Sequence, residues 1–221
     1  MAITLLSKTI VFPHPDEADQ NGLLAIGGDL GTERLISAYS MGIFPWYDHD
    51  SPILWWSPDP RLVLFPDELR VSRSLRQCLR KGIFTVTVNS AFEQVIRSCA
   101  DAHRRGQAGT WITGEMIRAY TELHQKGYAL SAEAWCDGEL AGGLYGIKLG
   151  SIFFGESMFA LRSNASKVAF VTFIEQMRQK GLTVVDCQVT TEHLLSMGAR
   201  EIPRSAFLAL LSRGISSSTS P

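Results

Sequence analysis

Three predicted strands in immediate succession, followed by a long helix and a further strand, constrain the fold of this chain more than any other feature. The three strands lie near residues 128–136, 139–148 and 151–155. Asp137-Gly138 is typical of a two-residue hairpin turn between the first two. A helix from about 163 to 180, stopped by Gly181, precedes the strand "LTVVDCQV". Because tight turns join antiparallel neighbours, the sequence predicts a mainly antiparallel sheet flanked by helices.

The remaining elements complete the pattern β-α-β-α-α-β-β-β-α-β-α after Arg61. They are the strand "RLVLF", a helix over 72–81, a strand over 83–88, a helix that opens with a capping box over 90–93, a helix over 113–126 capped by Thr113, and short helices around 191–197 and 203–213. This order resembles the acyl-CoA N-acyltransferase fold, a resemblance that concerns the fold alone. We therefore predict the α+β class, with an N-acyltransferase-like (GNAT-like) C-terminal domain.

The first 62 residues differ from the rest because they are rich in Gly, Pro and Trp, as in "NGLLAIGGDL" and "ILWWSPDPR". One helix is predicted there, capped by Thr32 and stopped by Gly42. The tail "GISSSTSP" has the composition of a disordered segment. We expect an N-terminal domain over 1–62, a catalytic domain over 63–213 and a disordered tail over 214–221.

The composition, the net charge and the absence of known motifs argue against several classes of function. With 45% hydrophobic and 19% charged residues the composition is ordinary for a soluble globular protein, and the net charge of −1 does not indicate a nucleic-acid partner. The four cysteines are scattered without metal-binding spacing, and no glycine-rich cofactor motif is present. No signal peptide or membrane-length apolar run is found. We expect a cytoplasmic protein with free thiols, no metal and no cofactor.

Two polar side chains lie inside the predicted strand "VVDCQV". Alternation along a strand places Asp186 and Gln188 on one face, and Val185 and Cys187 on the other. Burying a polar group without a partner costs roughly 1–3 kcal/mol. We therefore expect Asp186 and Gln188 to face a partner or a substrate.

The segment "SIFFGESMF" sets Glu156 at the end of an apolar strand. Glu156 is either a solvated residue beside ordinary core or the carboxylate at the mouth of a hydrophobic ligand pocket. The apolar candidates around such a pocket are Phe153, Phe154, Met158, Phe159, Phe170, Phe173 and Val185.

The segment "RVSRSLRQCLRK", residues 70–81, contains basic residues and no acidic ones. Arg73, Arg76 and Arg80 share one helical face. Near Trp111, this face suits a phosphate backbone with a base stacked on the indole, and a solvated surface is the alternative. His193 is either a helix-surface residue or a general base.

Assembled, these stretches resemble the leucyl/phenylalanyl-tRNA–protein transferase family. The segments that carry the resemblance run over nearly the whole chain in family order: "GLLAIGGDL" (22–30), "GIFPW" (42–46), "ILWWSPDPR" (53–61), "TWIT" (110–113), "FFGESMF" (153–159), "NASK" (164–167), "DCQV" (186–189) and "GAREIPR" (198–204). The resemblance implies an aminoacyltransferase that moves Leu, Phe or Met from aminoacyl-tRNA to a protein with an N-terminal Arg or Lys, marking that protein for N-degron proteolysis in bacteria.

The resemblance also implies roles for individual residues. Asp186 and Gln188 match the proposed catalytic pair of the family, with Glu156 at the same site. Trp46 and Trp111 match residues that contact the terminal adenosine and the aminoacyl region. The apolar pocket of the family corresponds to Leu144, Phe153, Met158, Phe170, Phe173 and Val185. The basic residues of the family that approach the tRNA acceptor stem correspond to a helix with Arg73, Arg76, Arg80 and Lys81. Since the sequence shows no interface signal, we expect a monomer.

The role of Gln188 follows from elementary chemistry. A neutral amide is a very poor base, whereas an α-amine with a pKa of about 7.7–8.0 is already partly neutral at pH 7. We hypothesise that the Gln188 carbonyl oxygen accepts a hydrogen bond from the attacking amine and aims it. Asp186 would hold Gln188, draw in the basic acceptor residue or carry the proton away.

Two rival functions are open at this point. An acetyl-CoA-dependent small-molecule N-acetyltransferase normally has Q/R-x-x-G-x-G/A before a helix, where backbone N–H groups meet the pyrophosphate. Here "RSNASK" has Ala165 and Lys167 at the two glycine positions, which argues against CoA. A non-catalytic RNA-binding module would leave the convergence of Asp186, Gln188 and Glu156 unexplained.

Overall fold

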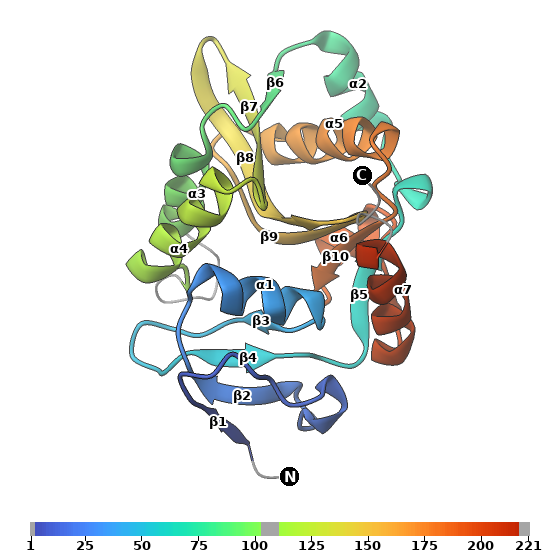
Figure 1. The fold of residues 1–221 in the computed structure, drawn as a ribbon. Helices are drawn as coiled ribbons and strands as arrows, with labels where there is room; N and C mark the ends of the chain where they lie inside the picture. Colours follow the sequence, from blue (N-terminus) through green and yellow to red (C-terminus); the bar gives the residue numbers. More distant parts are fainter. Residues whose placement is uncertain (1–2, 103–110, 217–221) are drawn as a thin grey trace.

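The computed structural model describes residues 3–102 and 111–216, and two β-sheets organise them (Figure 1). The smaller sheet has the strand order β1-β2-β4-β3. Its strands are β1 (Thr4–Leu6), β2 (Leu23–Gly27), β3 (Phe44–Pro45) and β4 (Leu54–Trp56). β1 and β2 are parallel, and the other pairs are antiparallel. No bounds of these strands are predicted from the sequence, because each strand is short and lies among turn-forming residues.

Helix α1 (Thr32–Ser40) lies between the smaller sheet and the rest of the molecule (Figure 1). The predicted cap at Thr32 is wrong, because Gly31 is the N-cap residue and the Thr32 hydroxyl instead donates a hydrogen bond to Glu122 at 2.9 Å. Gly42 follows the helix with a φ of +75°, a conformation that glycine adopts without strain. The predicted stop is therefore in place.

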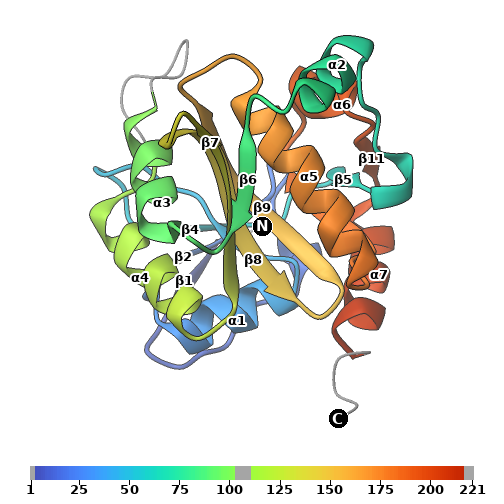
Figure 2. The same cartoon turned by 90° about the horizontal axis from the view of Figure 1, so that it is seen from above.

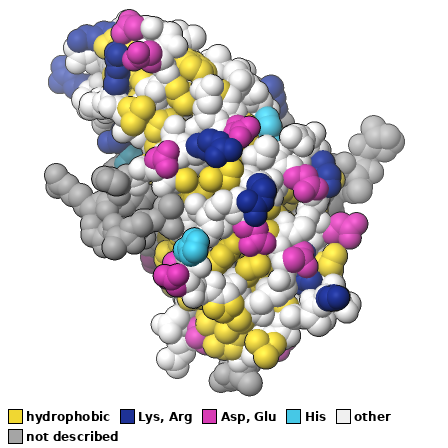
Figure 3. Space-filling model, turned by 90° about the vertical axis from the view of Figure 1, so that its left-hand side faces the viewer, with side chains coloured by type: hydrophobic (Ala, Val, Ile, Leu, Met, Phe, Trp, Pro, Cys, Tyr) yellow, Lys and Arg dark blue, Asp and Glu magenta, His cyan; other side chains and the backbone are white. Residues whose placement is uncertain are grey.

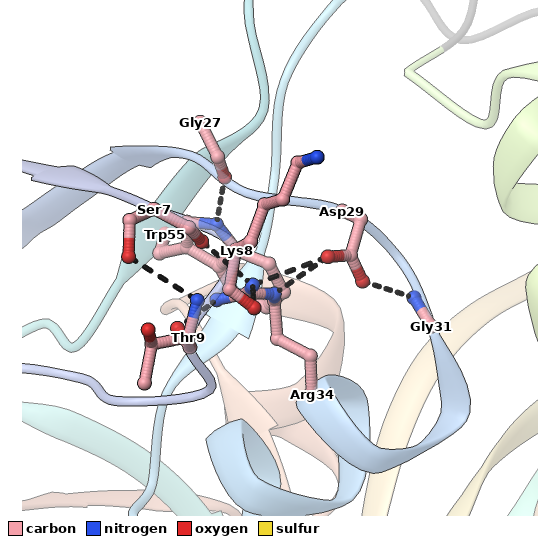
Figure 4. A network of polar contacts seen from close by, with 8 residues as sticks. All are labelled: Ser7, Lys8, Thr9, Gly27, Asp29, Gly31, Arg34 and Trp55. Atoms are coloured by element: carbon pink, nitrogen blue, oxygen red, sulfur yellow. Dashed lines mark hydrogen bonds and ion pairs between the residues drawn. The ribbon is translucent and has the colours of Figure 1, made fainter.

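A fully buried arginine ties the segment after β1 to α1 (Figure 4). The Arg34 guanidinium donates hydrogen bonds to the carboxylate of Asp29 and to the backbone carbonyl groups of Ser7, Lys8 and Thr9. A buried cation is tolerated when its donors are satisfied in this way. The network fixes the helix whose C-terminal half reaches the candidate site.

The larger sheet has the strand order β11-β5-β10-β9-β8-β7-β6. Its strands are β5 (Arg61–Leu64), β6 (Thr85–Val88), β7 (Ala129–Cys136), β8 (Glu139–Leu149), β9 (Ile152–Ala160), β10 (Val184–Gln188) and β11 (Arg200–Ile202). Neighbours are antiparallel except β9 and β10, which are parallel. Asp137 and Gly138 both have positive φ, so the predicted hairpin turn is confirmed.

Helices cover both faces of the larger sheet (Figure 2). Besides α1, the described helices are α2 (Arg73–Lys81), α3 (Phe92–Asp101), α4 (Gly114–Gln125), α5 (Ala165–Gln179), α6 (Glu192–Ser196) and α7 (Arg204–Ser216), and 3₁₀ turns lie at Pro15–Glu17 and Pro66–Glu68. α5 packs against β7 and β8 from one side, and α3 and α4 pack from the other. The predicted α+β class, with a mainly antiparallel sheet flanked by helices, is confirmed.

Helix α3 begins differently from the prediction. The capping box over 90–93 is wrong, because the N-cap residue is Ala91, whose side chain has no hydrogen-bond acceptor. The buried carboxylate of Glu133, from β7, accepts hydrogen bonds from the backbone N–H groups of Ser90 and Ala91, both at 3.4 Å. The backbone N–H groups at the start of α3 are therefore bound by Glu133, a residue distant in sequence, rather than by the local pair of Ser90 and Glu93.

One hydrophobic cluster crosses the predicted domain boundary. It joins Tyr39 and Trp55 from the first part to Phe154 and Phe207 from the second. The division at residue 62 stays a prediction. Because α7 continues to Ser216, residues 214–216 are helical rather than disordered, and the rest of the predicted tail lies outside the described residues. Within the described ranges, no helix is long and apolar enough to cross a membrane.

Candidate active site

A cavity of about 390 Å³ lies where β3 of the smaller sheet meets the parallel strands β9 and β10 of the larger one. Its lining is mainly apolar. Most of the predicted site residues line it, namely Trp46, Trp111, Leu144, Phe153, Glu156, Met158, Phe170, Val185 and Gln188. The structure thus brings together residues that lie far apart in the sequence.

Two indole rings border the cavity. Trp46 directly follows β3 and is 37% exposed, and Trp111 precedes α4 and is half-buried. Trp56 holds Trp46 in place, because its Nε1 donates to the Trp46 backbone oxygen at 2.6 Å and the two rings lie 5.9 Å apart. Partly exposed aromatic rings beside a cavity suit stacking with a planar group such as a nucleobase.

Strand β10 does not alternate at its C-terminal end. A β-bulge lies between Asp186 and Gln188, and Gln188 has a φ of +62°. Gln188 lines the cavity together with Val185 and Cys187, whereas Asp186 does not. The prediction that Asp186 and Gln188 share one face is therefore wrong, because the bulge interrupts the two-residue period on which it depends.

Asp186 is fully buried and forms a bidentate ion pair with Arg61, the first residue of β5. Arg61 Nε and Nη2 donate to the two carboxylate oxygens at 2.8 and 2.6 Å. Asp186 Oδ1 also accepts a hydrogen bond from the backbone N–H of Gln188 at 3.0 Å. Asp186 thus supports Gln188 from outside the cavity. Arg61 is not predicted as a site residue from the sequence, where its one signal is its place at the end of "WWSPDPR".

Glu156 lies in the middle of a strand rather than at its end, because β9 continues to Ala160. It is buried, which excludes the solvated alternative. Its Oε1 accepts hydrogen bonds from the Tyr39 hydroxyl at 2.7 Å and from Gln188 Nε2 at 2.9 Å, and its Oε2 accepts from the Tyr120 hydroxyl at 3.1 Å. Burial raises the pKa of Glu156 to about 7, although these hydrogen bonds lower it. The carboxyl group therefore titrates near neutral pH.

Tyr39 and Tyr120 are site residues that the sequence analysis misses. Both are fully buried, and their hydroxyl groups also contact each other. Burial, followed by the charge of Glu156, raises the pKa of both phenols well above 10, so they remain donors at neutral pH. The available signal is that each tyrosine lies on the apolar face of a predicted helix, where a buried hydroxyl needs a partner.

The hydrogen bond to Glu156 orients the Gln188 carboxamide. Since Nε2 donates to Glu156, the carbonyl oxygen of the same amide faces away from that carboxylate. Within the described parts of the chain, no protein group donates a hydrogen bond to this oxygen. Gln188 therefore presents an acceptor at the wall of the cavity.

Two further candidates have different positions. Phe173 is fully buried and packs behind the wall against Phe153, with ring centroids 4.7 Å apart. His193 lines the cavity, and burial together with nearby Lys167 lowers its pKa, which favours the neutral imidazole. No group of three or more His, Cys, Asp or Glu residues in the described ranges could hold a metal ion.

The predicted basic helix is α2, on the outside of the molecule. Arg73, Arg76, Arg80 and Lys81 are exposed, and Leu75 anchors the helix to the core. On the face shown in Figure 3, basic side chains gather at the upper edge with acidic ones beside them, and the rest of that face carries both signs interspersed. Attraction of a polyanion therefore depends on local groups rather than on a uniform field.

The described residues thus form an α+β architecture with a mainly apolar cavity beside the parallel strand pair. The sequence profile described as leucyl/phenylalanyl-tRNA protein transferase matches residues 63–212, and that of the N-terminal domain of the same family matches residues 28–59. The chain therefore belongs to the leucyl/phenylalanyl-tRNA–protein transferase family and is an aminoacyltransferase, as the resemblance implies.

Individual relatives agree over nearly their full length. The chain is 58% identical to the leucyl/phenylalanyl-tRNA–protein transferase of Anaeromyxobacter sp. (strain K), over 99% of this chain and 94% of the relative. It is 55% identical to that of Myxococcus xanthus, with the same coverage. Among solved structures, L-PGS from Bacillus licheniformis has a TM-score of 0.47 and 10% identity, over 88% of this chain and 71% of that one. A GCN5-related N-acetyltransferase from Kribbella flavida has a TM-score of 0.38 and 12% identity, over 75% and 59%.

Proposed function

We propose that this protein transfers Leu, Phe or Met from aminoacyl-tRNA to the N-terminal Arg or Lys of acceptor proteins in the cytoplasm, which marks them for N-degron proteolysis. Family membership supports a transferase of this kind. The observation that carries the proposal is the Gln188 carboxamide, held by Glu156 at the polar side of an apolar cavity. Such a site can bind an apolar aminoacyl group and orient an amine beside it.

The apolar wall selects the donor. The residues that we assign to the aminoacyl pocket are Leu144, Phe153, Met158, Phe170 and Val185, with Phe173 packed behind them. A hydrophobic pocket separates neighbouring substrates by only about 1–3 kcal/mol per methylene, so several apolar side chains are accepted. A charged side chain is rejected because its desolvation has no compensating partner on this wall.

The two indoles bind the end of the tRNA. Trp46 and Trp111 border the cavity, so the terminal adenosine stacks there while its ester reaches inwards. Stacking on an aromatic ring contributes about 1–3 kcal/mol per base. The exposed basic residues of α2 hold the phosphates of the acceptor stem.

Glu156 recognises the cationic acceptor. It is the one carboxylate among the described residues that line the cavity. The charge of Asp186 is already matched by Arg61 at 2.6 Å, so of the three roles considered for Asp186 we assign it the support of Gln188. A basic N-terminal residue is therefore attracted by Glu156, and its α-amine donates to Gln188 Oε1.

The reaction is the aminolysis of an ester. The amine nitrogen forms a bond to the aminoacyl carbonyl carbon, the ester C–O bond breaks, and the terminal ribose hydroxyl leaves with a proton. Because the α-amine is a competent nucleophile once neutral, alignment supplies most of the rate enhancement, with about 7–11 kcal/mol accessible from proximity. Gln188 provides the alignment.

The test is incubation of the purified protein with Leu-tRNA and a peptide that begins with Arg, read by mass spectrometry. The proposal predicts a mass gain of one leucine residue on the peptide N-terminus. The same peptide with an acetylated N-terminus is the matched control and gains nothing. An unmodified Arg peptide after long incubation with active charged tRNA would reject the proposal.

A further inference from the structure

Arg61 lies directly behind the candidate site without lining the cavity. It is fully buried at the start of β5, the strand that pairs with β10. Its guanidinium is held between the rings of Phe44 and Phe207, at 4.8 and 4.7 Å from the ring centroids. Phe44 itself lines the cavity. A charged group is placed here at a desolvation cost that only a well-formed pair offsets.

The guanidinium acts as a fixed fork on Asp186. Nε and Nη2 bind one carboxylate oxygen each, at 2.8 and 2.6 Å, which fixes both the position and the plane of the carboxylate. The same Oδ1 that receives Nε accepts the backbone N–H of Gln188 at 3.0 Å. One continuous series of contacts therefore runs from Arg61 through Asp186 to the Gln188 backbone.

The backbone of Gln188 needs such support. Its φ of +62° lies in the left-handed region, which is unfavourable for a residue with a side chain, and it follows the β-bulge of β10. This conformation is what directs the carboxamide to Glu156 and into the cavity wall. In a regular strand, Gln188 would lie on the face of Asp186 instead.

We propose that Arg61 is a positioning residue for the transfer reaction. It orients the Asp186 carboxylate, which holds the Gln188 backbone in its left-handed conformation and so sets the direction of the carboxamide. Arg61 touches neither substrate. This role rests on the proposed function of Gln188 as the group that aims the amine.

A double-mutant cycle between Arg61 and Gln188 tests this role. Arg61→Lys keeps the charge but removes the planar fork, so the carboxylate loses its fixed plane. We expect kcat to fall at least tenfold, with both KM values within twofold of wild type. In a Gln188→Ala background the same substitution should change the residual rate less than twofold, because the group that Arg61 positions is already gone.

The controls separate positioning from stability. Arg200→Lys removes another bidentate guanidinium, which pairs with Glu68 and stacks on Phe65 outside the cavity lining, and should leave kcat unchanged in both backgrounds. An equal loss from Arg61→Lys in both backgrounds, or an unchanged kcat in the folded variant, overturns the proposal. Absence of transfer by the wild-type protein refutes the proposed function, and with it this role.

A second variant covers the case in which Arg61→Lys does not fold. Arg61→Met with Asp186→Leu removes both buried charges together, an exchange that buried ion pairs often tolerate. The double variant removes the carboxylate that accepts the Gln188 backbone N–H, so we expect a rate at least tenfold below wild type. Because the two charges are removed together, the variant should still melt cooperatively. A wild-type rate in this variant overturns the proposal. The proposal is also overturned if the same two substitutions lower the rate as much in the Gln188→Ala background as in the wild-type background.

Discussion

Gln188 Nε2 lies 2.9 Å from Glu156 Oε1, so a single hydrogen bond joins the carboxamide and the carboxylate of the candidate site. The same carboxylate accepts the hydroxyl groups of Tyr39 and Tyr120, which come from α1 and α4. Side chains from two helices and two strands thus meet at one buried acid. The direction of Gln188 depends on this whole arrangement and on the bulge of β10.

Glu156 makes the stability of the protein depend on pH. Because its pKa is raised from 4.5 to about 7 by burial, the native state holds a proton there that the unfolded chain releases. This contribution is fully present below about pH 4.5 and is lost as the pH rises through 7, by about 3 kcal/mol at most. Glu156→Gln should remove this dependence. The measurement is the free energy of unfolding in urea from pH 4 to pH 8.

Glu122 supplies a control of opposite sign. The hydrogen bond from Lys126, and to a smaller extent that from Thr32, lowers the pKa of this exposed carboxylate. The Glu122→Gln variant should therefore lose stability relative to the wild type as the pH rises. A difference between wild type and Glu156→Gln that stays constant from pH 4 to pH 8 would show that Glu156 is not held near neutrality.

Donor selection should follow the polarity of the cavity wall. One tRNA sequence charged in turn with Leu, Phe, Met, Glu or Arg isolates the amino acid from the tRNA. We expect the kcat/KM values of the three apolar donors to differ by no more than about 200-fold, the range expected for one or two methylene contacts. The kcat/KM values of the charged donors should be far lower than those of the apolar donors. Comparable transfer of Arg or Glu would remove the apolar residues from the aminoacyl pocket.

Salt dependence locates the tRNA footprint. If Arg76 and Arg80 bind phosphates, each replacement by Ala lowers the slope of log affinity against log salt by about 0.7–0.9. The binding of charged tRNA over a range of salt concentrations measures this slope. Arg97→Ala is the matched control, because Arg97 is exposed on α3 and paired with Glu93. If neither Arg76→Ala nor Arg80→Ala changes the slope, the acceptor stem binds elsewhere on the protein.

The Trp46 indole should contribute to the binding of the terminal nucleoside. Trp46→Ala is expected to weaken binding of a non-reactive leucyl-adenosine amide by about 5- to 150-fold, the equivalent of one lost stacking contact. Tyr128→Ala removes an aromatic ring with the same 37% exposure outside the cavity and should have no effect. Calorimetric titration compares the two, and equal affinity in the Trp46 variant would exclude stacking on this ring.

The fold after Arg61 is largely predictable because its elements are long and periodic. The strands around Asp137-Gly138 and the helix before Gly181 follow from alternation, helical stripes and turn residues. Local caps are less reliable. Ser90 and Glu93 match a capping box, yet Glu133, from a distant strand, contacts the start of α3. Two-residue strands such as β3 carry no periodic signal at all.

Most residues that line the candidate site are predictable from the sequence, but their geometry is not. Composition and the family resemblance gather the apolar wall, the two indoles, Glu156 and Gln188, and the cavity contains them. Strict alternation then misplaces Gln188, since a bulge and a positive φ are not visible in "VVDCQV". Arg61, Tyr39 and Tyr120 are not predicted as site residues, because their partners lie between 36 and 125 residues away in the chain.

Gln188 is proposed to aim the attacking amine, and single-turnover transfer with Gln188→Ala measures this contribution. With charged tRNA and an Arg peptide both saturating, we expect a rate about 100-fold below wild type, the cost of losing alignment at the reacting atoms. Gln188→Glu retains an acceptor oxygen but places a second carboxyl group against Glu156, and should also be slow. A folded Gln188→Ala protein that transfers leucine at a rate close to wild type would exclude this role of Gln188.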